Sequence, residues 1–178
     1  MATVLDVERA RAAAASVLDP EVPVLTVEDL GVLRDVTLAD DGSVDVVITP
    51  TYSGCPAMAA IESDVRQAVT AAGFPVVRIR TVLSPAWTTD WMSEAGRRKL
   101  AAYGIAPPSP RGPGHAGPVS LTLGQRPALQ PDQQRPALQC PQCGSADVRE
   151  LAHFGSTACK SLWQCVTCRE PFDHFKVI

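Results

Sequence analysis

Residues 140–168, CPQCGSADVRELAHFGSTACKSLWQCVTC, decide the architecture of the C-terminal part of this chain. Two C-x2-C pairs, Cys140 with Cys143 and Cys165 with Cys168, stand 21 residues apart. Two residues between paired thiolates let a tight turn direct both sulfurs at one tetrahedral ion, about 2.3 Å away. The spacing therefore predicts a β zinc ribbon in which these four cysteines hold a structural zinc ion.

The predicted ribbon, residues 140–178, is too short to bury enough apolar surface alone, so zinc would supply much of its folding energy. Four cysteine thiolates also suit an iron–sulfur cluster or a redox dithiol pair, and these alternatives stay open. Gly144, after Cys143, can adopt a positive φ, whereas Arg169 holds the equivalent position after Cys168. We therefore expect slight strain in the second knuckle.

Cys159 is the odd thiol of the ribbon, six residues before Cys165 and too far from it to share a knuckle. A free cysteine packs well as a small hydrophobe, so a buried packing role is one interpretation. The other is a second functional thiol. His153 and His174 are expected to be structural or surface residues, because four cysteines already complete a tetrahedron.

Residues 106–139 contain eight prolines and few residues suited to a core, which predicts a linker. The sequence QRPALQ occurs twice in it, at 125–130 and 134–139, as a short duplication in a tolerant spacer. Only VSLTL, at 119–123, has the composition of a strand.

Residues 1–105 predict an α+β domain with the element order α, β, β, α, β, α. The second helix has the clearest apolar spacing, and ADDGS supplies the turn of a β-hairpin. Helices are predicted at 7–17, 56–72 and 90–103, and strands at 32–38, 44–48 and 76–83.

Cys55 stands out in this domain because it lies in TYSGCPAM, directly before Pro56. Proline at the first helical position predicts that Cys55 is the N-cap of the second helix. There the helix dipole would lower the pKa of the thiol and make it a nucleophile and a soft metal ligand. The alternative is a small residue tolerated at a helix start. The motif has no adjacent base, which disfavours a hydrolytic Cys-His enzyme.

Two groups of residues are candidate support for Cys55. Asp19 and Glu21, in the DPE segment after the first helix, would add hard oxygen ligands suited to transient iron binding. A turn that caps the first helix explains them equally well. Thr51 and Ser53 would surround the thiol with hydroxyl groups, although such residues are also ordinary turn formers.

Trp87, Trp91 and Met92 lie close together after the third predicted strand. Exposed aromatic residues with methionine would suit a partner-docking surface. The alternative is that they close the domain core, which we favour for at least one tryptophan.

Composition excludes several classes of protein. The net charge is −3 and the densest basic run is only Arg97, Arg98 and Lys99, which disfavours nucleic-acid binding. No apolar run approaches the ~20 residues of a membrane span, and no signal-like segment opens the chain, so we expect a cytoplasmic protein. In that reducing compartment the cysteine pattern favours metal binding over disulfides.

Three stretches carry a family resemblance: LDPEVPVLTVEDLGVLRDV (18–36), TPTYSGCPAM (49–58) and VVRIRTVLSPAWTTDWMSEAGRRKLAAYGIAPP (76–108). They resemble the metal-sulfur cluster assembly-factor domain of the MIP-type family. CPQCGS, FGSTACKSLWQC and EPFDHFK at the C-terminal end are similar to the zinc-ribbon tail of the PaaD (PaaJ) family. That family comprises the D subunits of the phenylacetyl-CoA 1,2-epoxidase system, formerly the phenylacetate-CoA oxygenase.

The resemblance implies a small mixed sheet with helices, followed by the linker and the ribbon. It implies an accessory, non-catalytic subunit in aerobic phenylacetate catabolism that aids iron or iron–sulfur centre maturation in an oxygenase or reductase subunit. Cys55 matches the family's motif cysteine and would hold iron or a cluster transiently, and Asp19 and Glu21 match its DPE element. Structural zinc is the expected resident cofactor, and a homodimer is left open.

Two other functions make different demands on the cysteines. A structural subunit of the oxygenase complex would not need Cys55. A thiol-redox protein would need turnover in isolation and a resolving thiol, for which Cys159 is the spare candidate.

Overall fold

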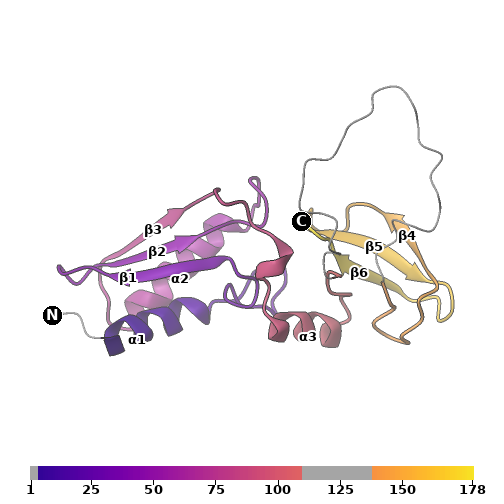
Figure 1. Cartoon of the computed structure of the whole chain (residues 1–178), viewed down its shortest axis with the longest axis horizontal. Coiled ribbons are helices and arrows are strands. Elements are labelled where there is room, and N and C mark those ends of the chain that lie inside the picture. Colours follow the sequence, from indigo (N-terminus) through magenta and orange to yellow (C-terminus); the bar gives the residue numbers. More distant parts are fainter. Residues whose placement is uncertain (1–3, 110–137) are drawn as a thin grey trace, which may run out of the picture.

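The computed structural model describes residues 4–109 and 138–178 of the chain. Within these ranges the chain forms two three-stranded sheets, and helices pack against the first of them (Figure 1). This arrangement confirms the predicted α+β class. Most of the predicted linker, 106–139, lies outside the described residues, as does the strand expected at 119–123.

The first sheet joins an antiparallel hairpin to a parallel strand. β1 (Leu33–Leu38) pairs antiparallel with β2 (Val44–Ile48), and β2 pairs in parallel with β3 (Val77–Thr81). Gly42 closes the hairpin at a φ of 81°, which glycine adopts without steric cost. A parallel pair needs a crossover connection, and a helix supplies it between β2 and β3. The sheet is therefore mixed, with the predicted hairpin at one side.

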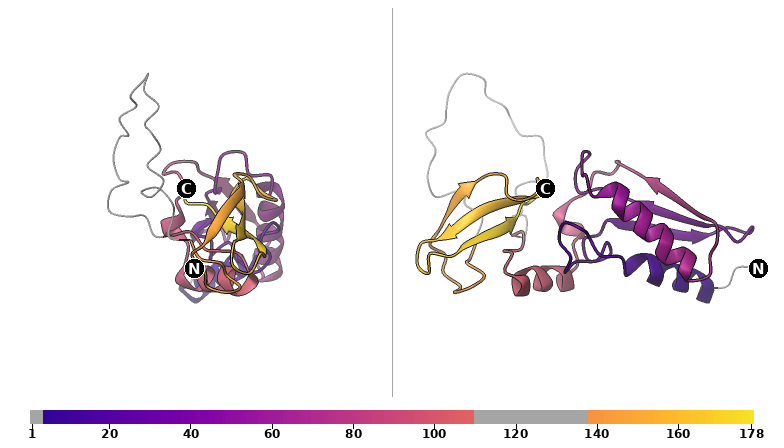
Figure 2. Two further views of the ribbon diagram at one scale, coloured as in Figure 1. Left: turned by 90° about the vertical axis from the view of Figure 1, so that its right-hand side faces the viewer. Right: turned by 180° about the vertical axis from the view of Figure 1, so that it is seen from behind.

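Helices α1 (Val4–Ala15) and α2 (Met58–Ala71) cover one face of this sheet (Figure 2). Both match the predicted helices to within three residues at each end. The apolar spacing of α2 directs three side chains into the core: Ile61, Val65 and Val69.

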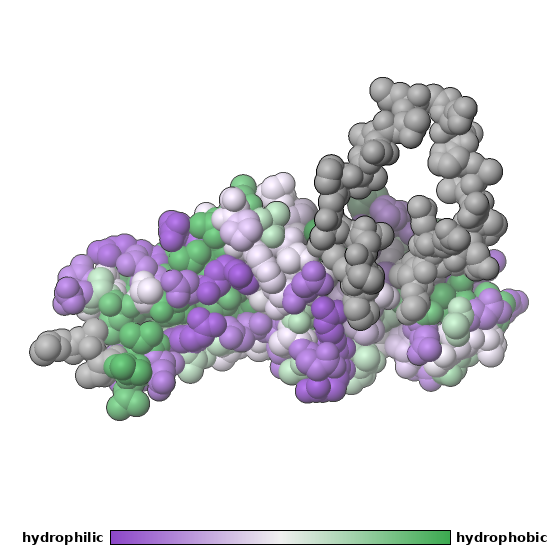
Figure 3. Space-filling view, viewed as in Figure 1, coloured by the Kyte–Doolittle hydropathy of each residue, from purple (hydrophilic) through white to green (hydrophobic). Residues whose placement is uncertain are grey.

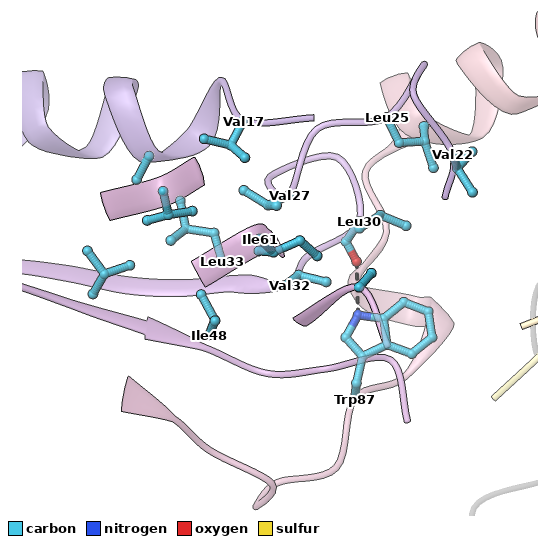
Figure 4. Packing of buried hydrophobic residues seen from close by; sticks show 14 of the residues in the cluster. Val17, Val22, Leu25, Val27, Leu30, Val32, Leu33, Ile48, Ile61 and Trp87 are labelled. Atoms are coloured by element: carbon cyan, nitrogen blue, oxygen red, sulfur yellow. Dashed lines mark hydrogen bonds between the residues drawn. The ribbon is translucent and has the colours of Figure 1, made fainter. Parts of the chain in front are cut away.

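The core of the first domain lies between these helices and the sheet, and Figure 4 shows part of it. Its largest fully buried side chains include Leu25, Leu30, Ile48, Ile61 and Leu100. Each such burial stabilises the fold by about 1.5–3 kcal/mol relative to exposure.

Trp87 belongs to this core. Its side chain is only 4% exposed, and its indole N–H donates a hydrogen bond to the Leu30 carbonyl oxygen at 2.9 Å (Figure 4). Met92 is buried as well, and Trp91 is half-buried beneath the Arg34 guanidinium, 3.5 Å above its ring. The core interpretation is therefore confirmed for Trp87, and its docking interpretation is wrong.

The segment after Trp87 differs from the prediction of a single helix starting at Asp90. A 3₁₀ turn, η1 (Thr89–Trp91), comes first, and α3 (Glu94–Tyr103) follows it. Ser93 is the N-cap of α3, because its Oγ accepts the backbone N–H three residues further on at 2.9 Å. Gly104 caps the end of α3 at a φ of 89°, so the helix ends at Tyr103, the predicted last residue.

The second sheet is an antiparallel ribbon of β4 (Val148–Ala152), β5 (Lys160–Cys165) and β6 (Pro171–Phe175). It has its own small buried cluster, formed by Ala106, Leu138, Cys140, Val148, Trp163, Cys165 and Phe172. Two of the paired cysteines therefore belong to the ribbon's core.

The end of the ribbon is joined to the first domain by direct contacts. The Ala106 N–H donates to the Asp173 carbonyl oxygen at 2.8 Å, and the Phe175 N–H donates to the Ala106 carbonyl oxygen at 2.9 Å. The Thr89 N–H donates to the Ile178 carbonyl oxygen at 3.3 Å. Phe175 is buried within the first domain's hydrophobic cluster. The ribbon is thus docked against that domain, with the C-terminus at the junction (Figure 1).

The surface varies along the molecule. Figure 3 shows strongly hydrophilic surface over α3, where Glu94 and Arg98 are exposed. Hydrophobic surface lies at the start of α1, where Val4 and Leu5 are 76% and 75% exposed. In the described ranges, every helix is too short or too polar to cross a membrane.

Candidate metal and thiol sites

The four paired cysteines converge on one point of the ribbon. Their sulfur atoms all lie within 4.8 Å of one another. The Cys140 and Cys168 sulfurs are 3.7 Å apart, and those of Cys143 and Cys165 are 3.6 Å apart. Four thiolates about 2.3 Å from a tetrahedral zinc ion would lie about 3.8 Å from each other. Two of the pairs stand near this separation and all four sulfurs lie within 4.8 Å, so the cluster fits such an ion.

Two equivalent turns position these sulfurs. The Gly144 N–H donates to the Cys140 carbonyl oxygen at 2.8 Å, and the Arg169 N–H donates to the Cys165 carbonyl oxygen at 3.1 Å. Gly144 has a φ of 74° and Arg169 a φ of 68°. Arginine adopts this left-handed conformation at a cost of about 1–2 kcal/mol, so the strain expected in the second knuckle is confirmed.

A backbone hydrogen bond favours the thiolate form of Cys165. The Cys168 backbone N–H donates to its sulfur at 3.4 Å and helps lower the pKa of Cys165 to about 6. Thiolate is the form that binds a metal. Over the described ranges, this is the only set of three or more histidine, cysteine and acidic side chains close enough to share an ion.

Cys55 lies in the turn that leads into α2, and it is not the N-cap. α2 begins at Met58, and Ala57 occupies the N-cap position. The Met58 N–H donates to the Cys55 carbonyl oxygen at 3.3 Å, which closes a turn ahead of the helix. The prediction placed Pro56 at the first position of the helix. The helix starts two residues later, because Pro56 and Ala57 form this turn.

The pKa of the Cys55 thiol is raised, which contradicts the predicted lowering. Burial is the largest cause, and the negative charges of Glu21 and Asp19 add to it. A hydrogen bond from the Ala57 backbone N–H acts in the opposite direction without overcoming them. The half-buried thiol is therefore mainly protonated at neutral pH.

Asp19 and Glu21 come from the turn after α1. The Asp19 Oδ1 atom accepts the backbone N–H of Glu21 at 2.7 Å and that of Val22 at 2.8 Å, so Asp19 stabilises this turn. Burial raises the pKa of Glu21, and the charge of Asp19 raises it further. The structure brings both carboxylates within electrostatic range of Cys55.

Thr51 is buried and Ser53 is exposed. In the described part of the chain, neither hydroxyl hydrogen-bonds to Cys55. Tyr52, between them, is the residue that sequence reasoning missed. Burial raises the pKa of its hydroxyl, and the charge of Cys55 and a hydrogen bond with that thiol raise it further. The sequence signal that could have identified Tyr52 is its position three residues before Cys55 in the TYSGCPAM motif.

Cys159 lies at the junction of the two domains. Its side chain is 4% exposed and belongs to the first domain's hydrophobic cluster, against which Cys55 also packs. The Thr157 Oγ1 and Cys159 Sγ atoms are 3.0 Å apart, and the Lys176 N–H donates to the Cys159 carbonyl oxygen at 2.9 Å. Burial raises the pKa of the thiol, and the charges of Glu21 and Asp19 also act on it.

An open cleft of about 460 Å³ lies between residues of the two domains, next to this junction. Glu21 and Tyr103 line it from the first domain, and Lys160 and Phe172 line it from the ribbon. The Lys160 side chain is only 7% exposed and pairs with Asp173 at 3.4 Å. Sequence reasoning did not single out Lys160, although it directly follows Cys159.

Models of known protein families match both parts of the chain. A model of the iron-sulfur cluster assembly protein family matches residues 8–80, and a model of the PaaD zinc beta ribbon domain matches residues 124–176. A crystal structure of a DUF59 domain from Bacillus anthracis, a domain of unknown function, superposes with a TM-score of 0.50 at 26% identity. It covers 54% of this chain and 92% of that one.

Three curated relatives are similar to the chain. The putative D subunit of the 1,2-phenylacetyl-CoA epoxidase of Escherichia coli K12 is 45% identical over 90% of this chain and 86% of its own length. An Fe-S protein maturation auxiliary factor of Porphyromonas gingivalis is 41% identical over 48% of this chain and 81% of its own. The Fe-S protein maturation auxiliary factor YitW of Bacillus subtilis is 35% identical over 52% and 91%.

The fold and the cysteine cluster thus define an iron-sulfur assembly-type domain joined to a zinc ribbon. The chain belongs to the PaaD family, the D subunits of the phenylacetyl-CoA epoxidase system.

Proposed function

We propose that this chain is an accessory subunit that helps load iron or an iron–sulfur centre into a partner protein, with Cys55 as the thiol that holds the cargo. The observation that carries the proposal is the setting of Cys55, a half-buried thiol within range of the charges of Glu21 and Asp19. Thiolates bind iron and its clusters, and carboxylates add hard oxygen ligands. In this proposal the isolated chain catalyses no reaction.

The relatives support both the role and the client. Two of them are named Fe-S protein maturation auxiliary factors, and the matching assembly-protein model spans Cys55. The Escherichia coli relative is named for the phenylacetyl-CoA epoxidase. The client would therefore be an oxygenase or reductase subunit of that system. We place the chain in the cytoplasm, where its six cysteines would stay reduced.

The ribbon has a separate role in this proposal. Its four paired cysteines bind one structural zinc ion, because their sulfurs already stand near tetrahedral separation. Cys140 and Cys165 also belong to the ribbon's small core, so the ion and the core stabilise each other.

Two alternative functions differ in whether they require Cys55. Thiol-disulfide exchange is disfavoured, because the raised pKa of Cys55 and Cys159 leaves little thiolate at neutral pH. A purely structural subunit would stabilise the epoxidase complex without using Cys55 at all.

To decide between the maturation role and the structural role, the oxygenase and reductase subunits are co-produced with the native chain, with the Cys55→Ser variant, or with no added chain. We expect Cys55→Ser to lower the iron content and the activity of the partner subunits to the level without the chain, while the variant still co-purifies with them. Ser53→Ala, which alters an exposed hydroxyl in the same turn, is the matched control and should load iron fully.

The opposite result is also informative. Full iron loading with Cys55→Ser, together with a complex that dissociates when the chain is left out, would replace the maturation role by that of a structural subunit.

A further inference from the structure

We propose that the outer edge of β3 is a docking site for an extended acidic segment of a partner protein, which adds to the first sheet as a further strand. β3 lies at the end of the strand order β1-β2-β3, so within the described ranges only one of its sides is paired (Figure 1). The inference does not depend on the cargo role of Cys55. It rests on unpaired backbone groups, on a regular strand edge and on charge.

The backbone of β3 leaves a row of hydrogen-bonding groups without partners. The Val44 N–H donates to the Val76 carbonyl oxygen at 2.9 Å, and the Val82 N–H donates to the Ile48 carbonyl oxygen at 2.9 Å. Because the backbone groups of successive residues point to opposite sides of a strand, even-numbered residues here face β2 and odd-numbered ones face outward. The outward groups have no partner in the part of the chain that the structure describes. They belong to Val77, Ile79 and Thr81. Such a row is a template for an added strand.

The three other sheet edges in the described ranges are interrupted, whereas the β3 edge is not. β1 and β4 each carry a register shift, between Leu33 and Asp35 and between Glu150 and Ala152. The backbone of Ala106 bonds along β6. β3 keeps its register with β2 through all five of its residues. Bulges and covering segments are means by which proteins block strand addition, so β3 is the edge left open to it.

Charge disfavours a second copy of this chain as the added strand. An antiparallel copy centred on Ile79 would set Arg78 opposite Arg80 of that copy. A copy centred on either arginine would set that arginine opposite its counterpart. Like charges directly opposite each other destabilise a strand pair. The added strand therefore comes from another protein.

The same charge specifies the chemistry of the partner strand. Arg78 already pairs with Asp41 at 3.2 Å, whereas Arg80 is exposed and has no ion pair among the described residues. Ile79, between them, packs against the hydrophobic cluster of the first domain. A strand that alternates carboxylate and apolar side chains would therefore meet Arg80 on one face and Ile79 on the other. Leu83, which is 58% exposed, adds apolar surface just beyond β3.

The test titrates the isotope-labelled, zinc-loaded, full-length chain with a nine-residue peptide in which glutamate and valine alternate, and NMR follows the backbone amides. We expect the largest shifts at the outward amides of Val77, Ile79 and Thr81, and slower hydrogen exchange there at saturation. The amides of Arg78 and Arg80, which face β2, should exchange as before and are the internal control. A peptide of alternating lysine and valine should bind roughly tenfold more weakly.

Two substitutions at one position separate strand pairing from attraction between charges. Thr81→Pro removes an outward N–H and leaves the ladder to β2 intact, as strands tolerate proline at such edge positions. Thr81→Ala keeps that N–H, and both variants lose the hydroxyl that donates to the Glu62 Oε1 atom at 2.8 Å. We expect Thr81→Pro to bind the glutamate peptide about fivefold more weakly than Thr81→Ala does.

The remaining outcomes are equally decisive. Arg80→Glu should reverse the preference, so that the lysine peptide binds more tightly than the glutamate peptide. Shifts away from β3, or no binding of the glutamate peptide to the native chain, would overturn the proposal. Equal binding by Thr81→Pro and Thr81→Ala would also overturn it, because the attraction would then need no strand pairing. The exchange measurement uses the native chain, so it decides the question even where a variant folds poorly.

Discussion

Phe175, in the last strand of the ribbon, packs against Trp87 of the first domain, with ring centroids 6.2 Å apart and ring planes at 56°. Trp87 in turn donates its indole N–H to the Leu30 carbonyl oxygen. The contact links the ribbon to the core of the assembly-type domain. It helps hold β5 and β6 against the first domain, and Cys159, just before β5, is buried in that domain's hydrophobic cluster.

Removing the Phe175 ring should therefore destabilise the chain. Phe175→Ala creates a cavity at a side chain only 1% exposed, and we expect a loss of about 3–5 kcal/mol in the free energy of unfolding. Phe154→Ala removes a ring that is 65% exposed, and its effect should stay below about 1 kcal/mol. Denaturant melts of the zinc-loaded proteins measure both, and equal losses would disprove the role of the junction.

The strained second knuckle predicts a stabilising substitution. Arg169 has a φ of 68°, which glycine adopts without the steric penalty of a Cβ atom. After the greater entropy of glycine in the unfolded chain is subtracted, Arg169→Gly should gain up to about 1 kcal/mol. Arg169→Ala keeps the Cβ atom and should gain nothing. Thermal melting in zinc-saturated buffer compares the two, and an equal gain would point to the arginine charge instead.

Zinc and the ribbon core should be lost together. Cys165→Ser removes a buried ligand, so we expect zinc to fall from one per chain to near zero and Trp163, now 7% exposed, to become solvated. Metal analysis and tryptophan fluorescence follow the two events. Cys159→Ser should keep its zinc, because Cys159 lies outside the four-cysteine set. Zinc retained in Cys165→Ser would exclude the proposed ligand set.

The lowered pKa of the buried His174 side chain predicts that the stability of the chain depends on pH. Burial lowers its pKa from 6.5 to about 4, so between these values the unfolded chain binds a proton that the folded chain does not. Its contribution is full above pH 6.5 and is lost as the pH falls toward 4, by roughly 3 kcal/mol at most. We expect His174→Gln to flatten this part of the pH profile and His153→Gln, at an exposed position, to leave it unchanged. Urea melts at several pH values, with zinc content checked, measure the effect.

Local patterns predicted most of the elements. The hairpin around Gly42, the apolar face of α2 and the stop at Gly104 depend on residues close in sequence, and all three are confirmed. The start of α3 differed, because the segment after Trp87 first forms a 3₁₀ turn and Ser93 caps the helix. Ser93 and Asp90 have similar propensity for the N-cap position, so the sequence pattern alone does not show which of them caps the helix.

Residue spacing was enough to locate the four-cysteine cluster, since a C-x2-C turn sets the separation of two sulfurs whatever surrounds it. Sequence motifs also identified Cys55, with Asp19 and Glu21 as its candidate support, and Cys159 as a separate candidate thiol. Tertiary packing was needed to bring Cys159 within electrostatic range of Glu21 and Asp19 and to raise the pKa of Cys55. The reason is physical: burial and through-space charge depend on chain segments that are far apart in sequence, 34 residues for Glu21 and Cys55 and 104 residues for Cys55 and Cys159, which no local spacing encodes.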